Sequence, residues 1–318
     1  MPSRNHLGGS KCIVSLIIPC FNEEEAIPIF YTEAMKTLEN MNLESYELIF
    51  VDDGSADKTC EVLRNISTKD KNVHFLSFSR NFGKESALYA GLSKASGDFI
   101  AVMDVDLQDP PSLLPQMLEA IQKEGFDCAA TRRVTRKNEP PIRSFFARLF
   151  YRLMGKISDV PVVDGARDFR LMTQQYKNAV LSLMEKNRFA KGIFPWVGFK
   201  TKWFAYENIE RAAGKTKWSF WKLFLYSIDG IIGFSTKPLA FSAVAGIISL
   251  FAAFCLISFI IIRRVFFGDP VQGWASTICF IVFFSGVNLF SIGISGLYIS
   301  KIYTEVKNRP LYIIKEEQ

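Results

Sequence analysis

The sequence has no paired cysteine spacing. Its six cysteines include no Cys-x-x-Cys pair, and two of them, Cys255 and Cys279, fall in long apolar segments. This pattern argues against a zinc site or a disulfide framework, so we expect free thiols in a reducing compartment. No apolar signal core precedes Ile13, so residues 1–237 are expected to remain in the compartment where they are made.

Two common phosphate-binding motifs are also missing. No Gly-x-Gly-x-x-Gly follows the first apolar run, and no Gly-x-x-x-x-Gly-Lys-[Ser/Thr] occurs anywhere in the chain. Neither a dinucleotide-binding fold nor a P-loop is therefore supported. Any nucleotide must be bound by other residues.

Charged residues are absent from two long segments near the C-terminus. Residues 238–262 are 25 uncharged residues in a row, and residues 270–300 are another 31. At about 1.5 Å per residue, each helix would be long enough to cross a hydrocarbon core of about 30 Å. The alternative of two buried core helices is disfavoured, because such helices rarely need so many uncharged residues. The sequence predicts two membrane spans.

Positive charge is concentrated in two stretches. Residues 132–156 carry eight Lys or Arg against one Glu, and residues 186–222 carry nine against two Glu, so each has a local charge of +7 within a chain of net charge +6. Next to predicted spans, such clusters indicate phosphate groups or anionic lipid headgroups as partners. Nucleic acid is disfavoured, because no nucleic-acid-binding motif accompanies the charge.

The first 131 residues alternate between apolar runs and helical segments. Strands are predicted at residues 13–19, 47–51, 73–78, 99–103 and 126–131, with helices at 23–41, after Asp57, at 85–95 and from Pro110. Alternation with short connections predicts an α/β domain with a mostly parallel sheet and helices on both faces.

Polar residues follow each predicted strand. They are Asn22-Glu23, Asp52-Asp53, Ser79-Arg80-Asn81, Asp104 with Asp106, and Arg132-Arg133. Because ligands of such sheets bind beyond the carboxyl ends of the strands, we expect these residues to line one site.

The most informative short motif is Asp104-Val105-Asp106, followed by Gln108. Two carboxylates at a strand end can share a Mg²⁺ or Mn²⁺ ion with a nucleotide diphosphate, since these ions prefer oxygen ligands and keep positions open for phosphate. The alternative is that Asp106 or Asp109 merely caps the next helix.

Four motifs together carry a family resemblance. They are Pro19-Cys20-Phe21-Asn22-Glu23-Glu24, Val51-Asp52-Asp53-Gly54-Ser55, Asn81-Phe82-Gly83-Lys84 and Asp104-Val105-Asp106-Leu107-Gln108-Asp109-Pro110. In this order they resemble family 2 glycosyltransferases of the GT-A fold, in the branch that uses polyprenyl phosphates. The resemblance covers nearly the whole chain and implies transfer of one sugar, with inversion, from a nucleotide sugar to a polyprenyl phosphate. UDP-glucose is the donor that the family favours.

The resemblance also implies roles for residues at the donor site. Pro19, Phe21, Glu23 and Asp53 would line the nucleoside pocket. Asp104 would contact the ribose or the metal, and Asp106 with Gln108 would hold Mg²⁺ or Mn²⁺ on the diphosphate. Lys84 would lie near the base, or it would be an ordinary surface lysine at a helix start.

Phosphate groups of donor and acceptor would be bound by four basic residues, Arg132, Arg211, Lys215 and Lys217. The acceptor phosphate is already anionic and needs positioning more than deprotonation. Asp164 or Asp168 would act as a base or orient the acceptor, or the pair would form a structural contact with the neighbouring arginines. Some relatives carry a small residue at the place of Asp168, which weakens its claim as an obligatory base.

Two rival functions belong to the same fold. One is an inactive membrane scaffold, against which the intact acidic pair and Gln108 argue. The other is a processive polysaccharide synthase, which typically carries Gln-x-x-Arg-Trp. Neither Gln174-Gln175 nor Lys217-Trp218 forms that motif.

The expected organisation is a catalytic domain at residues 1–216, a juxtamembrane amphipathic segment at 217–237, a two-helix transmembrane domain at 238–300 and a tail at 301–318. Residues 144–158 predict a basic amphipathic helix that lies in the membrane interface or docks on the domain core. Basic residues flank the spans at both outer ends, so both termini are predicted to be cytoplasmic at the plasma (inner) membrane. Arg263 and Arg264 in the intervening loop complicate this topology, and a re-entrant or homo-oligomeric arrangement would accommodate them.

Overall fold

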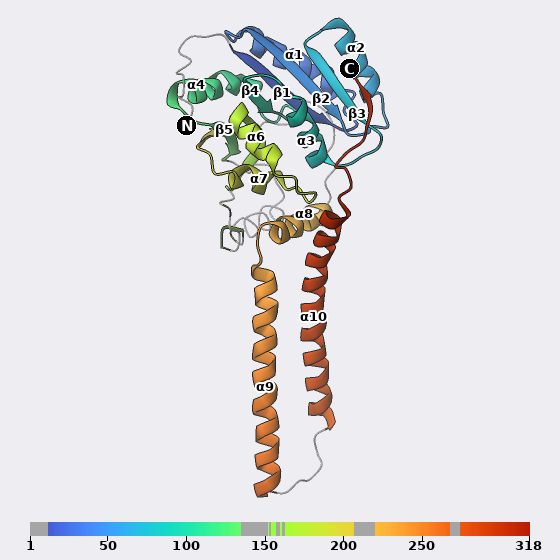
Figure 1. Cartoon of the computed structure of the whole chain (residues 1–318), viewed down its shortest axis with the longest axis vertical. Coiled ribbons are helices and arrows are strands. Elements are labelled where there is room, and N and C mark those ends of the chain that lie inside the picture. The colour runs from blue at the N-terminus through green and yellow to red at the C-terminus, as the bar shows by residue number, and fades with distance from the viewer. Residues whose placement is uncertain are drawn as a thin grey trace.

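The computed structural model describes residues 12–134, 152, 154–156, 160, 163–206, 220–267 and 274–318. Seven strands from residues 13–206 and one from the C-terminal end form an eight-stranded sheet with the order β7-β5-β6-β4-β1-β2-β3-β8 (Figure 1). The strands are β1 Ile13–Cys20, β2 Ser45–Asp52, β3 Val73–Phe78, β4 Phe99–Val102, β5 Cys128–Arg133, β6 Ala166–Thr173, β7 Thr201–Tyr206 and β8 Ile314–Glu317.

Helices cover both faces of this sheet. They are α1 Ala26–Glu39, α2 Thr59–Lys69, α3 Lys84–Lys94, α4 Leu114–Glu124, α6 Gln174–Ser182 and α7 Ala190–Trp196, with a 3₁₀ turn, η1, at Pro111–Leu113. Leu16 and Ile18 of β1 pack in one apolar core with residues of α1, α2 and α4, whereas Ile17 packs in the other with residues of α3, α6 and α7. Strands buried on both faces explain the uninterrupted apolar runs, and the predicted α/β architecture is confirmed.

The order of the strands differs in one place from the predicted series. β5 does not lie beside β4, because β6 inserts between them and runs antiparallel to both. Pairing of β1 with β2 and β4, of β2 with β3, and of β5 with β7 is parallel. The sequence did not predict β6 as a strand of this sheet, since its partners are set by contacts between distant segments.

The last residues of the chain form a sheet strand instead of a free tail. β8 pairs antiparallel with β3, and Arg64 of α2 binds Glu316 through two hydrogen bonds of 2.9 Å. Just before β8, the ring of Tyr312 stacks on Phe78 of β3, with centroids 4.9 Å apart. The C-terminal segment is therefore anchored to the edge of the sheet, beside β3.

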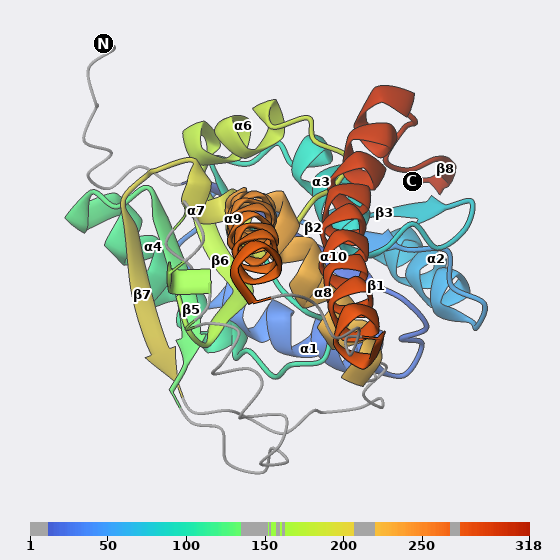
Figure 2. The same cartoon turned by 90° about the horizontal axis from the view of Figure 1, so that it is seen from below.

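Three further helices follow the sheet domain. α8 Phe220–Gly233 lies beneath it, and α9 Lys237–Phe267 and α10 Trp274–Lys307 extend away side by side (Figures 1 and 2). By length and composition α9 and α10 could cross a membrane, and the side chains of their most apolar windows are not buried within the protein. They are therefore not core helices of a soluble domain.

Three residues of α10 form polar contacts with other parts of the described chain: Lys301, Glu305, and Tyr298, whose hydroxyl donates a hydrogen bond of 2.6 Å to the Ser235 carbonyl oxygen. Lys301 forms an ion pair of 2.6 Å with Asp229 of α8 and donates a hydrogen bond of 2.9 Å to Asn187. One turn later, the Glu305 carboxylate accepts hydrogen bonds from the backbone N–H groups of Lys186 and Asn187. The end of α10 is thus held against the loop that follows α6. Most of the predicted amphipathic helix at 144–158 lies outside the described residues.

The stacked Tyr312 should stabilise the domain. We expect Tyr312→Ala to lower the unfolding free energy by about 2 kcal/mol, because it removes apolar contact area and an aromatic pair. Thermal unfolding of the purified full chain in detergent would measure the change. Tyr312→Phe keeps the ring and should unfold near the wild-type temperature, and equal unfolding of Tyr312→Ala and wild type would contradict the anchoring role.

Candidate functional site

The polar ends of β1, β2, β3 and β4 meet at one edge of the sheet, as predicted. Asp52 ends β2 and is 1% exposed. Its Oδ1 accepts a hydrogen bond of 3.0 Å from the Ser55 N–H, and its Oδ2 accepts one of 2.7 Å from the Ser77 hydroxyl of β3. This carboxylate therefore joins the loop that follows β2 to the neighbouring strand β3.

Asp53 holds the loop that leads into α3. Its oxygens accept hydrogen bonds from the backbone N–H of Phe82 at 2.7 Å and of Gly83 at 2.9 and 3.1 Å. Burial raises the pKa of Asp53, while these two N–H groups oppose the rise. The predicted contact of Asp53 with the nucleoside is untested, and the structure adds this positioning role, which the sequence did not reveal.

Two residues of these loops adopt left-handed backbone conformations. Gly54 has φ +68°, and a Cβ at this position would lie 2.4 Å from the Arg80 carbonyl carbon, so only glycine fits. Asn22 has φ +54°, and its side-chain oxygen accepts a hydrogen bond of 2.8 Å from the Ala56 N–H. The loop after β1 is thereby joined to the loop after β2. Pro19 is buried in β1, and Phe21 and Glu23 are half-buried beside it.

Asp104 and Asp168 meet through the pairing of β4 with β6. The antiparallel register pairs Val102 with Arg170. Two residues beyond the end of β4, and two residues back along β6, position 104 lies opposite position 168. The Lys84 ammonium lies between the two carboxylates, 2.6 Å from Asp104 Oδ1 and 2.5 Å from Asp168 Oδ2. Lys84 is therefore not an ordinary surface lysine at a helix start, and its place near the base stays a prediction.

The charges of this group depend on one another. Burial alone would raise the pKa of Asp168, but the Lys84 ammonium holds it well below its usual range, with a smaller contribution from Lys191. Burial likewise disfavours the Lys84 charge, but Asp104 and Asp168 raise the pKa of Lys84 above its ordinary value. Asp168 and Lys84 are therefore both ionised at neutral pH.

The loop after Asp104 has a constrained conformation. Asp106 is 9% exposed and accepts a hydrogen bond of 3.1 Å from the Gln108 N–H, and Leu107 between them has φ +54°. A branched residue with positive φ is a strained conformation that the surrounding contacts must hold. Neither Asp106 nor Asp109 forms a side-chain cap of η1 or α4, so the capping alternative is wrong.

Asp109 instead anchors this loop to β6 and β7. It is fully buried, and its Oδ1 accepts hydrogen bonds from Arg167 Nε at 3.0 Å and from the Tyr206 hydroxyl. Arg167 also reaches the Gln108 side-chain oxygen at 3.3 Å. Burial raises the pKa of Asp109 to about 6, although the Arg167 charge acts to lower it. The sequence gave no role to Arg167 or Tyr206, and only the Asp-Arg-rich pattern near Asp168 hinted at such a pair.

The predicted acceptor residues are only partly described. Arg132 is exposed at the end of β5, opposite Ala166 of β6, and Asp164 is exposed in the turn that leads into β6. Gly165 in this turn has φ +76°, and a Cβ there would lie 2.4 Å from the Arg133 carbonyl oxygen. Arg132 and Asp164 thus lie on neighbouring segments, but Arg211, Lys215 and Lys217 fall outside the described residues.

Comparisons with known proteins give a consistent result. The family model for glycosyl transferase family 2 matches residues 15–178. The SfII prophage-derived bactoprenol glucosyl transferase of Shigella flexneri is 41% identical over 95% of this chain and 97% of its own. The prophage bactoprenol glucosyl transferase homolog of Escherichia coli is 40% identical over 95% and 98%. Among solved structures, glucosyl-3-phosphoglycerate synthase of Mycobacterium tuberculosis aligns with a TM-score of 0.46, 18% identity, and coverage of 70% and 78%.

Lys84 should stabilise the folded protein most at neutral pH. With EDTA present, Lys84→Met leaves Asp104 and Asp168 facing each other without a cation between them. We expect the unfolding free energy to fall by about 2 kcal/mol at pH 7. This is less than for a fully buried pair, because the Lys84 side chain is 35% exposed. The depressed pKa of Asp168 gives stability that is present above its unfolded pKa and lost as pH falls.

The difference in unfolding free energy between Lys84→Met and wild type should therefore shrink as the pH falls from about 5 to about 3, because wild type loses the contribution of the ionised Asp168 in that range. Thermal unfolding across this range would measure it, with Lys84→Arg as the charge-retaining control. A difference that is the same at every pH would contradict the ionic role.

Proposed function

Because the chain belongs to glycosyl transferase family 2, we propose that it transfers one glucose from UDP-glucose to a polyprenyl phosphate. The observation that carries this proposal is the identity of about 41% to a bactoprenol glucosyl transferase over 95% of the chain. The mostly parallel GT-A-type sheet and its acidic edge fit such a donor.

In the proposed reaction, a phosphate oxygen of the lipid attacks the anomeric carbon of glucose. The bond from that carbon to the diphosphate oxygen breaks, UDP leaves, and the configuration inverts. The attacking phosphate is already anionic, so the protein must chiefly position it and stabilise the departing diphosphate.

The donor would bind along the edge formed by β1, β2 and β4. Pro19, Phe21, Glu23 and Asp53 surround the place proposed for the nucleoside. Asp53 fixes the loop before Lys84 through the N–H groups of Phe82 and Gly83, so this wall of the pocket is formed before the donor arrives.

The residues after β4 fit a divalent cation. Asp104, Asp106 and Gln108 offer oxygen ligands, and Asp104 already pairs with the Lys84 ammonium at 2.6 Å. In the described part of the chain, no cluster of three or more His, Cys, Asp or Glu could hold a metal. The protein would therefore supply only part of the ligand set, as is usual for Mg²⁺ bound with a diphosphate. When bound, Mg²⁺ or Mn²⁺ would neutralise charge on the leaving diphosphate.

Arg132, Arg211, Lys215 and Lys217 are proposed to bind phosphate groups of donor and acceptor. Arginine suits this role because its planar guanidinium can bind two phosphate oxygens at once. Asp168 stays ionised beside Lys84, which favours a positioning role for it over proton transfer. Asp164 lies near Arg132 and is the better placed of the two to orient the acceptor.

One assay tests the reaction and the acidic motif together. Purified protein would receive radiolabelled UDP-glucose and polyprenyl phosphate, and label would be counted in the extracted lipid. We expect Asp106→Asn to lower transfer at least about a hundredfold and EDTA to stop it until Mg²⁺ or Mn²⁺ is added. Glu119→Gln, an exposed carboxylate of α4, is the matched control. Full activity of Asp106→Asn, or in excess EDTA, would remove the metal from the mechanism.

α9 and α10 are proposed to span the plasma membrane with both ends of the chain in the cytoplasm. Nucleotide sugars are made there, and Lys/Arg residues before α9 and after α10 outnumber those of the loop between them. The catalytic edge would then lie on the leaflet that presents the lipid phosphate.

Cysteine labelling on a cysteine-free background tests this topology. Gln272→Cys should react with an impermeant reagent from outside, because it lies between the spans. Lys315→Cys, exposed in β8, should react only after the membrane is permeabilised. The reverse pattern would overturn the orientation.

A further inference from the structure

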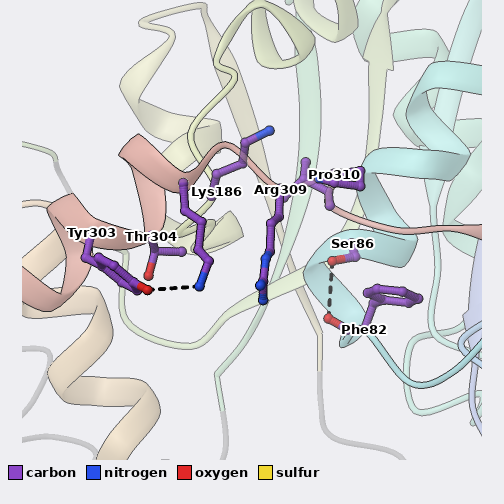
Figure 3. A pocket seen from close by; sticks show the side chains of 9 residues that line it. Phe82, Ser86, Lys186, Tyr303, Thr304, Arg309 and Pro310 are labelled. Carbon is purple, nitrogen blue, oxygen red and sulfur yellow. Dashed lines mark hydrogen bonds between the residues drawn. The ribbon is translucent and has the colours of Figure 1, made fainter.

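A cavity of about 320 Å³ lies where the C-terminal end of α10 meets the start of α3 (Figure 3). Its lining includes Tyr303 and Lys307 from the last turns of α10, and Arg309 from the segment that follows. Phe82 and Ser86 contribute from α3 and the loop before it. No residue proposed to bind donor or acceptor lines this cavity.

The end of α10 brings two cations to this cavity. Asn308 has φ +45°, which ends the helix and turns the chain so that Lys307 and Arg309 both line the space. The Lys307 ammonium donates a hydrogen bond of 2.9 Å to the Tyr303 hydroxyl.

These cations have no acidic partner in the described part of the chain. The described lining contains no carboxylate, and Glu305 nearby accepts hydrogen bonds from the backbone N–H groups of Lys186 and Asn187. The C-terminus of a helix carries only about half a negative charge. Two full positive charges at this end therefore leave the cavity electropositive.

The remaining lining is partly polar, with Ser86, Lys186 and Thr304, and partly apolar. Phe82, Pro310 and Leu311 form walls beside the two cations. The candidate span Phe280–Lys307 ends at the cavity, so under the membrane placement proposed above the cavity lies at the level of lipid headgroups. A ligand that fits has a negatively charged phosphate next to a short carbon chain, and it is present at this depth of the membrane.

We propose that this cavity binds the phosphodiester headgroup of an anionic membrane phospholipid. Lys307 and Arg309 hold the phosphate oxygens, and Phe82, Pro310 and Leu311 contact the glycerol carbons. Because the N–H of Phe82 binds Asp53, a bound headgroup also supports the loop at the donor edge. This inference rests on the proposed membrane placement but not on the identity of the transferred sugar.

The test measures thermal unfolding of the full chain in neutral detergent micelles, without any sugar donor. Short-chain phosphatidylglycerol should raise the unfolding temperature to a plateau, whereas short-chain phosphatidylcholine should not. Lys307→Gln and Arg309→Gln should each raise the half-saturating concentration about tenfold, the effect of losing one charge-assisted hydrogen bond. Lys315→Gln removes the same charge from the same segment outside the cavity and should behave as wild type.

Three results would overturn the proposal. One is an equal rise in unfolding temperature with the two lipids. Another is a wild-type rise for Arg309→Gln, whose exposed side chain can be replaced without disturbing the fold. The third is a saturable rise in unfolding temperature with inorganic phosphate alone that Arg309→Gln abolishes. The cavity would then bind a soluble anion and not a lipid headgroup. Since no transfer is measured, failure of the proposed glucosyl transfer would appear only in the radiolabel assay.

Discussion

Two carboxylates that face each other across neighbouring strands set the constraint on which this edge of the sheet depends. The β4–β6 register brings Asp104 and Asp168 together, and like charges in such a pair repel. Lys84 resolves the repulsion at 2.6 and 2.5 Å. Its place at the first residue of α3 then fixes where that helix must begin. The loop before α3 is fixed in turn, because Asp53 binds its backbone N–H groups. One cation thus positions β4, β6 and the start of α3 relative to each other.

The acidic residues of this edge look alike in sequence, but some are buried and hold the loops together, whereas Asp104 is partly exposed. Asp52, Asp53 and Asp109 are buried and use their oxygens on neighbouring hydroxyl, backbone N–H and guanidinium groups. Asp104 is partly exposed beside Lys84. Buried carboxylates of the first kind are costly unless they are hydrogen-bonded, and their hydrogen bonds make the loops rigid. A preformed edge then needs less rearrangement when a charged donor binds.

Local patterns predicted much of this fold and less of its site. The buried strands β1 to β4 were predicted within one or two residues, because runs that are apolar on both faces are a strong local signal. The insertion of β6 and the addition of β8 were missed, since Ile314–Glu317 contains three charged residues and pairs through contacts with a distant strand. The motif predicted Asp104 and Asp106 as neighbours of a ligand. It could not reveal the Lys84 bridge or the Asp109–Arg167 pair, which depend on the antiparallel register of a strand about sixty residues away.

The C-terminal segment joins the two long helices to the start of α3 through side-chain contacts as well as through the chain itself. Lys301 and Glu305 hold α10 to α8 and to the loop after α6, and β8 then extends the sheet beyond β3. Tyr312 stacks on Phe78, whose ring also packs edge-on against Phe82, 5.9 Å between centroids. Phe82 in turn donates its N–H to Asp53. Because each of these contacts joins rigid elements, a displacement of α10 cannot leave the start of α3 unchanged. The position of α10 relative to the ends of β1 to β4 is therefore set by the same residues that hold the loop before α3.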